Sequence, residues 1–144
     1  MASTHVAHDC LVGDNVIMSN LATLGGHVQI GNWAILGGGV LVHQFTQIGE
    51  HSLIGGGFRA VQDVPPFIIA ANHPLEYKGV NIVGLKRRGF SKKDMDSIKK
   101  AYREFFRSGG NRKTVIEKIE SEFPKTKVIQ KILDFIKYSN RGII

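Results

Sequence analysis

The chain has 144 residues, a single cysteine and a formal net charge of +7 at neutral pH. This length suits one domain with at most a small appendage, and one cysteine cannot form an intrachain disulfide framework or a zinc site by itself. No apolar run approaches the ~18 residues of a membrane span and no leader peptide is recognisable, so we expect a cytoplasmic protein without an integral membrane segment.

The charge is unevenly distributed along the chain. Residues 1–64 carry one basic and four acidic residues, a net charge of −3, whereas residues 65–144 carry 18 basic and 8 acidic residues, a net charge of +10. The first segment also holds 11 of the 17 glycines and 5 of the 6 histidines. Two segments of different composition therefore meet near Pro65 and Pro66.

The first segment repeats with a period of six residues. Ten hexads run from His5 to Val64, in which the second place is always apolar and the third is glycine in six. A short strand and a tight turn in each hexad would point one aliphatic side chain inward, and stacked coils would bury a column of them. Period-2 alternation and two-residue hairpin signals are lacking, which disfavours an antiparallel sandwich. The pattern predicts a parallel β-helix over residues 1–70.

These hexads resemble those of the hexapeptide-repeat acyltransferases, whose β-helix is left-handed and three-sided. The resemblance implies a mainly β fold of that hand with 18 residues per coil, so that the first, fourth and seventh hexads share a face. Those hexads contain His8, His27 and His43. We expect the three histidines to form a vertical array.

A histidine array suits proton transfer. His8 can accept a proton from a hydroxyl at neutral pH, and Asp9 can orient the ring or stabilise the imidazolium. Gly26 lies outside the repeating glycine position, which makes its N–H a candidate donor to an oxyanion. A zinc site on three histidines is the alternative, but His8 and His43 would be about 10 Å apart at ~4.8 Å per coil, so we expect no metal.

Residues 71–90 are expected to form a linking loop with a basic segment, and helical signals follow it. Ser91 is a suitable N-cap, and apolar residues at helical spacing predict a helix that ends near Gly109-Gly110, a second before Pro124 and a third after it. Residues 91–144 should therefore form a three-helix C-terminal domain, an α-helical bundle after the β-helix.

Five motifs occur in a distinctive order: HVAHDC, TLGGH, VHQF, QDVPPF and GLKRRGF. Together they resemble the acyl-carrier-protein-dependent UDP-N-acetylglucosamine O-acyltransferases, which begin lipid A synthesis, over residues 4–144. The resemblance implies transfer of a 3-hydroxyacyl chain from acyl carrier protein to the sugar 3-hydroxyl by a histidine general base. It also implies a homotrimer with active sites between subunits and no bound cofactor, because the acyl donor is carried on the phosphopantetheine of acyl carrier protein.

The resemblance further implies roles for individual residues. His8 is the general base, Asp9 supports it, and the Gly26 N–H faces the oxyanion. Guanidinium groups bind phosphate oxygens in bidentate fashion, which suits an arginine pair to the diphosphate of the sugar nucleotide. The residues expected to bind substrate, with Gly56 as the limit on acyl length, are His5, His27, His43, Gln44, Gly56, His73, Asn81, Arg87 and Arg88.

The chain departs from the family pattern at two points. Family members have a longer β-helix before the HVAHDC motif, so we expect an N-terminally shortened relative, and Val83 stands where a glutamate contact to the ribose is expected. A sister N-acyltransferase of acylated glucosamine and an inactive trimeric scaffold remain alternatives. The basic helical segment suits an acidic carrier protein. Nucleic-acid binding is disfavoured because the basic residues lack interleaved aromatics for base stacking.

Overall fold

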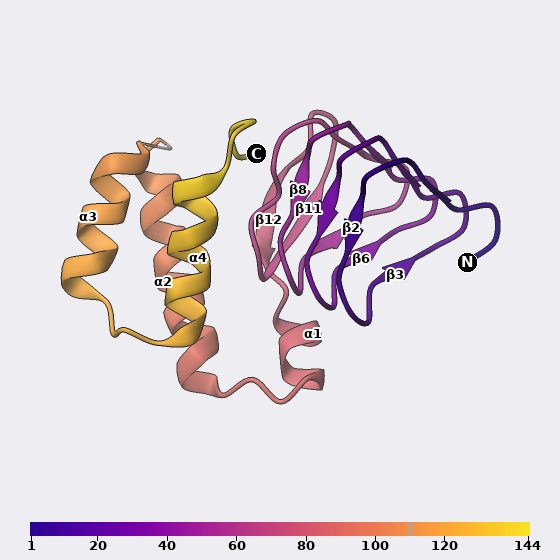
Figure 1. Cartoon of the computed structure of the whole chain (residues 1–144). Coiled ribbons are helices and arrows are strands. Elements are labelled where there is room, and N and C mark those ends of the chain that lie inside the picture. Colours follow the sequence, from indigo (N-terminus) through magenta and orange to yellow (C-terminus); the bar gives the residue numbers. More distant parts are fainter. Residues whose placement is uncertain (110) are drawn as a thin grey trace.

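The computed structural model describes residues 1–109 and 111–144 as a β-solenoid beside a bundle of helices (Figure 1). Gly110, at the expected end of the first long helix, lies outside the described residues. None of the helices in the described part of the chain has the length and apolarity that crossing a bilayer requires.

Ten two-residue strands occupy the first two places of the ten hexads. They are β1 (His5–Val6), β2 (Leu11–Val12), β3 (Ile17–Met18), β4 (Thr23–Leu24), β5 (Gln29–Ile30), β6 (Ile35–Leu36), β7 (Leu41–Val42), β8 (Gln47–Ile48), β9 (Leu53–Ile54) and β10 (Arg59–Ala60). Strands β1, β4, β7 and β10 form one parallel sheet, and β2, β5 and β8 a second. The third sheet contains β3, β6 and β9 together with β11 (Ile68–Ala71) and β12 (Glu76–Val80). Paired strand residues are 18 apart, as His5 is with Thr23, which confirms the predicted three-hexad coil.

The second place of each hexad forms the core of the solenoid. From Leu24 onward these side chains are buried with at most 4% exposure, whereas Val6 and Val12 in the first coil are 49% and 44% exposed. At the third place the coils approach closely: a Cβ on Gly25 would lie 2.7 Å from the Gln44 backbone nitrogen. Glycine is therefore required at position 25 to allow these two coils to stack.

The fifth place of each hexad turns the corner between two sheets. In hexads one to nine this residue has φ between +55° and +79°, a left-handed conformation that is unusual for side chains other than glycine. The fifth-place residues stack 18 apart into three columns. We call them the histidine corner (Asp9, His27, Phe45), the tryptophan corner (Asn15, Trp33, His51) and the glycine corner (Leu21, Gly39, Gly57).

Residues 71–90, expected to form a loop, instead contain the whole of β12 and the short helix α1 (Ile82–Arg87). β11 extends the third sheet beside β9, and its other edge pairs with β12 in antiparallel fashion. An exposed sheet edge offers unpaired backbone groups, and β12 satisfies them. α1 then starts directly below the solenoid, where it places the basic segment (Figure 1).

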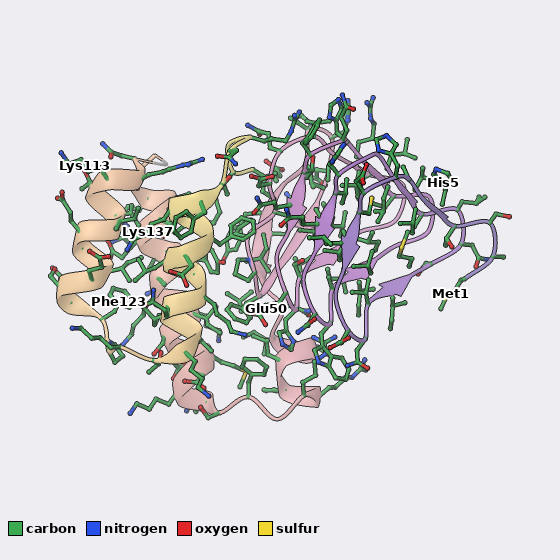
Figure 2. All side chains as sticks on the ribbon, viewed as in Figure 1. Met1, His5, Glu50, Lys113, Phe123 and Lys137 are labelled. Carbon is green, nitrogen blue, oxygen red and sulfur yellow. The ribbon has the colours of Figure 1, made fainter. Side chains whose placement is uncertain are left out.

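Three further helices form the C-terminal bundle: α2 (Lys92–Arg107), α3 (Arg112–Glu122) and α4 (Lys127–Tyr138). The Ser91 side chain accepts a hydrogen bond from the Asp94 N–H, which confirms the predicted N-cap of α2. Glu50, on the side of the solenoid that faces the helices (Figure 2), pairs with Lys131 of α4 at 2.7 Å.

The C-terminal residues return to the solenoid and bond to the buried Asp63. Its carboxylate accepts from the Gln47 N–H at 2.8 Å and from the Ser139 hydroxyl, and its own N–H donates to the Gly142 carbonyl at 2.8 Å. We call these three contacts the Asp63 clasp. They join the end of α4 to the last coil.

Candidate active site

Asp9 bridges two imidazoles at the histidine corner. One of its carboxylate oxygens lies 2.9 Å from Nδ1 of His8 and 3.7 Å from Nε2 of His27, and the two rings meet edge to face at 5.1 Å. The hydrogen bond from His8, and then the charge of His27, lower the pKa of Asp9. An ionised carboxylate only accepts, so the proton of a neutral His8 ring lies on Nδ1 and Nε2 is free to take another. This is the tautomer that a general base needs.

Phe45 completes the histidine corner and is not among the site residues predicted from the sequence. Its ring stacks on His27 with centroids 4.6 Å apart and planes within 6°, and it is 54% exposed. The stacking fixes the rotamer of His27 and directs Nε2 toward Asp9. Its place, 18 residues after His27 in a corner column, was the signal that could have identified it.

Gly26 lies directly against the catalytic candidate. A Cβ on this residue would fall 2.7 Å from Nε2 of His8, so only glycine leaves room for the imidazole. The equivalent N–H in the second hexad, that of Asp14, donates to the Asn32 side chain one coil further on at 2.7 Å. The residue one coil after Gly26 is Gln44, and within the described residues the Gly26 N–H has no hydrogen-bond acceptor. A free donor beside a free base suits an oxyanion site.

His43 does not join this cluster, so the three histidines do not form one vertical array. It occupies the third place of its hexad, and its Nδ1 lies 3.1 Å from the Gln44 carbonyl oxygen. The side chains that could share an ion are instead His8, Asp9 and His27, whose ligand atoms lie within 4.8 Å of one another. If zinc were bound here, its third protein ligand would therefore be Asp9 and not His43, as the sequence had suggested.

His5 is exposed on β1 at the end of the solenoid away from the helices (Figure 2). It lies in the coil of His8 and three residues before it. His73 is exposed in the turn between β11 and β12. Among the described residues, no hydrogen bond or ion pair joins either side chain to the histidine corner.

A second group of candidates lies at the tryptophan corner. Arg88, which caps the end of α1, directs one terminal nitrogen (NH1) to Nδ1 of His51 at 3.2 Å, and its Cζ lies 5.3 Å from the centre of the Trp33 ring. Desolvation, and then the charge of Arg87, lower the pKa of Arg88, although a guanidinium remains charged throughout the physiological range. Arg87 itself is exposed.

Asn81 has a structural position rather than an open one. It is 3% exposed; its Nδ2 donates to the His51 carbonyl at 3.0 Å, and its Oδ1 accepts from the Gly84 N–H at 3.3 Å. These bonds cap α1 and fasten it to the tryptophan corner. Val83, where the family pattern has glutamate, is 62% exposed on the same helix.

Gly56 lies beside the glycine corner, away from both groups. A Cβ there would approach the Gly38 carbonyl oxygen to 3.2 Å, so a larger residue requires a shift of a few tenths of an ångström. The candidate residues of one chain therefore lie along different edges of the prism. Among the described residues, no hydrogen bond or ion pair joins His8 or His27 to Arg87 or Arg88 within this chain.

Comparison with known proteins identifies the family. Residues 63–144 match the family model described as UDP N-acetylglucosamine O-acyltransferase, domain 2. The chain belongs to this O-acyltransferase family. The acyl-[acyl-carrier-protein]–UDP-N-acetylglucosamine O-acyltransferase of Aliivibrio salmonicida is 46% identical over 142 residues, which are 99% of this chain and 54% of that protein. That of Thiobacillus denitrificans is 43% identical over 144 residues, which are 100% of this chain and 56% of that protein.

Solved structures of the O-acyltransferase family share the fold. The UDP-N-acetylglucosamine acyltransferase of Bacteroides fragilis superimposes with a TM-score of 0.96 at 44% identity, over 99% of this chain and 56% of that one. The Francisella novicida enzyme gives 0.94 at 36% identity, over 100% and 53%. The predicted solenoid with C-terminal helices is thus confirmed as the family fold. The chain spans about half the length of the relatives it matches.

Proposed function

We propose that this protein transfers a 3-hydroxyacyl chain from acyl carrier protein to the 3-hydroxyl of UDP-N-acetylglucosamine. The observation that carries this proposal is the placing of His8 against Gly26: Nε2 of the imidazole lies 2.7 Å from where a Gly26 Cβ would be, and the N–H of the same residue has no acceptor within the part of the chain that the structure describes. Acyl transfer to a hydroxyl needs this pair: a base for the hydroxyl proton and a donor for the oxyanion.

The proposed reaction uses these groups in sequence. Nε2 of His8 takes the proton of the sugar hydroxyl as its oxygen attacks the thioester carbon, and the carbonyl oxygen becomes an oxyanion near the Gly26 N–H. The tetrahedral intermediate then collapses, the carbon–sulfur bond breaks, and the imidazolium returns its proton to the departing thiolate. Asp9 stabilises the imidazolium between these two steps.

We further propose that the site is completed by a neighbouring subunit in a homotrimer. Two groups of family residues, the histidines and the arginines, lie at different corners of one chain. A symmetric assembly of prisms would place the histidine corner of one subunit against the arginines of the next. The diphosphate would then be held by one subunit while its neighbour performs the chemistry.

The basic face of α2 is the proposed docking surface for the carrier protein. A groove of about 800 Å³ between α2 and the end of α3 is lined by four basic residues, Lys92, Lys93, Lys100 and Arg103, and by three acidic ones, Asp96, Glu104 and Glu122, so its lining has a small net positive charge. A positive surface speeds the encounter with an acidic partner and is sensitive to salt. Docking here would leave the acyl chain to reach the solenoid on its flexible phosphopantetheine.

A thioester-consumption assay tests the proposal. This chain and a version extended to the length of its relatives are each incubated with UDP-N-acetylglucosamine and 3-hydroxyacyl carrier protein, with His8→Ala variants as matched controls. We expect release of free thiol that depends on the sugar nucleotide and is lost in His8→Ala. Turnover that is equal in the His8→Ala variant, or no turnover at either length, contradicts the proposal.

A further inference from the structure

Arg88 is held from two sides by the tryptophan corner. The Trp33 ring, 40% exposed, lies against the guanidinium, and Nδ1 of the buried His51 accepts a hydrogen bond from it. Arg87, the preceding residue, is exposed, and among the described residues it forms no side-chain hydrogen bond or ion pair. Of these two adjacent arginines, the side chain of Arg88 is therefore fixed by its neighbours and that of Arg87 is exposed.

The hydrogen bond fixes the protonation state of His51. A guanidinium has only donors, so Nδ1 of His51 must be the acceptor and the ring must be neutral, with its proton on Nε2. Nε2 faces the Glu50 carboxylate at 3.9 Å, which suits that tautomer. Burial, and then the charges of Arg88 and Lys131, lower the pKa of His51 to about 4, so the ring remains an acceptor at neutral pH.

His51 is itself immobilised. Its ring stacks at 5.9 Å on Phe67 and meets Phe90 edge to face at 4.9 Å. Its carbonyl receives the Asn81 side chain that caps the start of α1. One residue therefore fixes both ends of the helix that carries the arginines, through its carbonyl at the start and through its ring at the end.

We propose that Trp33 and His51 form a seat that fixes the Arg88 guanidinium in advance and so raises the affinity for the diphosphate of the sugar nucleotide. This inference rests on the proposed function, in which Arg88 contacts that diphosphate. A free arginine loses rotamer freedom when it binds, and a guanidinium that is already held loses less. Trp33 and His51 are positioning residues, because they act through Arg88.

Substitutions at position 51 separate the hydrogen bond from the packing. His51→Phe keeps a ring in the aromatic stack but removes the acceptor, and phenylalanine occurs at positive φ at Phe45 and Phe67. His51→Asn keeps an acceptor at the position of Nδ1 but removes the ring. We expect His51→Phe to weaken UDP binding roughly tenfold and His51→Asn to restore most of the affinity.

Trp33 is tested in the same way. Trp33→Leu removes the π face and should weaken UDP binding several-fold, whereas Trp33→Phe keeps the face and should bind almost as tightly as the wild type. In steady-state assays the KM for the sugar nucleotide should rise while kcat changes little, because binding rather than chemistry is affected. Circular dichroism of each variant establishes that it is folded.

A double-mutant cycle decides between the seat and a general structural role. The affinity for UDP is measured by titration calorimetry for His51→Phe in the wild-type, Arg88→Ala and Arg87→Ala backgrounds. We expect the loss to disappear with Arg88→Ala and to persist with Arg87→Ala. An equal loss in all three backgrounds, or no loss in the wild-type background while Arg88→Ala binds weakly, overturns the seat. Unchanged UDP affinity in Arg88→Ala overturns the proposed role of the arginine itself.

Discussion

Asp9 positions both imidazoles of the proposed chemistry, because a single carboxylate oxygen lies against His8 and His27. Its left-handed backbone, with φ of +58°, turns the side chain outward at the corner. Aspartate tolerates this conformation better than most residues do. The corner thus provides an exposed acid next to an exposed base without disturbing the aliphatic column inside the coil.

His8→Ala should lower kcat by about 10²–10⁴-fold, the usual contribution of a positioned base. The KM for the sugar nucleotide should change much less, since the proposed diphosphate site lies at the arginines and not at His8. Asp9→Asn should give an intermediate loss, because the ring would remain but its tautomer would no longer be fixed. Steady-state kinetics with and without a chelator are the measurement. Activity that is abolished by the chelator would instead support zinc at His8, Asp9 and His27.

Within the described residues neither Gln44 nor any other group accepts the Gly26 N–H, and Gln44→Asn should supply an acceptor that occupies it. Asparagine at the same place of the hexad accepts the N–H one coil below, as Asn32 does from Asp14. Loss of one oxyanion donor lowers kcat by about 10²–10³-fold. Gln44→Ala is the matched control, because it removes the side chain but leaves the N–H free. If the two variants have equal kcat, this N–H does not serve the reaction.

The buried His51 should make stability fall in mild acid. Its pKa is about 4 in the fold and ordinarily 6.5, so between these values the unfolded chain binds more protons and stability decreases as the pH is lowered. The loss is at most about 3.5 kcal/mol. Arg88 and Lys131 oppose the added charge, while Glu50 lies 3.9 Å away and reduces the effect. Urea unfolding from pH 7 to 4 should show a flatter profile for His51→Phe than for the wild type.

At the scale of elements, the Asp63 clasp joins the helical bundle to the solenoid. The carboxylate is 1% exposed and receives bonds from the last coil and from the residue after α4. This contact joins the solenoid to the helices together with three others. They are the hydrogen bond from the Tyr102 hydroxyl to the Pro66 carbonyl, the Glu50–Lys131 pair and the stacking of Tyr77 of β12 on Phe106 of α2.

Asp63→Ala should lower the free energy of unfolding by about 3 kcal/mol, because a buried network of charge-assisted hydrogen bonds is lost. Hydrogen exchange should rise first in α4 and the C-terminal residues. Asp134→Ala, which removes an exposed carboxylate on α4, is the control and should change stability by less than about 0.5 kcal/mol. Equal destabilisation by both variants would contradict the clasp.

The elements that could be predicted from sequence are those with local causes. All ten hexad strands follow from one inward aliphatic every six residues, and α2 follows from Ser91 and the apolar spacing after it. β12 and α1 were missed because they depend on distant partners. β12 needs the edge of β11, and α1 is capped by a side chain bound to the tryptophan corner.

The site was predicted in part for a similar reason. The histidines at 8, 27 and 43 are 19 and 16 residues apart rather than 18, and each residue of offset moves a side chain to the next place around the coil. His27 moves to a position from which it still reaches Asp9, whereas His43 moves away. The contacts of Arg88 to Trp33 and His51 have no sequence signal, since 55 and 37 residues separate them.

At the scale of the whole molecule, the separation of histidines from arginines predicts shared sites. His8→Ala and Arg88→Ala subunits, each nearly inactive alone, should regain about one quarter of wild-type activity when co-refolded in equal amounts. If each site takes His8 from one subunit and Arg88 from its neighbour, each of these residues is intact with a chance of about one half in a randomly mixed trimer. About one site in four then has both residues intact. Mass spectrometry confirms the mixing. If every site lies within one subunit, the mixture remains inactive.

In each hexad, the positions that pack the fold differ from the positions at the corner that carry the candidate site residues. Packing requires an aliphatic residue at the second place of the hexad, and the coils approach each other closely at the third place. Selection for stability therefore acts on these two places. The fourth and fifth places point outward, and in three corners they hold a base, an arginine seat and bare glycine. A lineage can therefore exchange substrates by substitutions at these places while the same stack of coils persists, which makes the hexad an adaptable unit of catalytic surface.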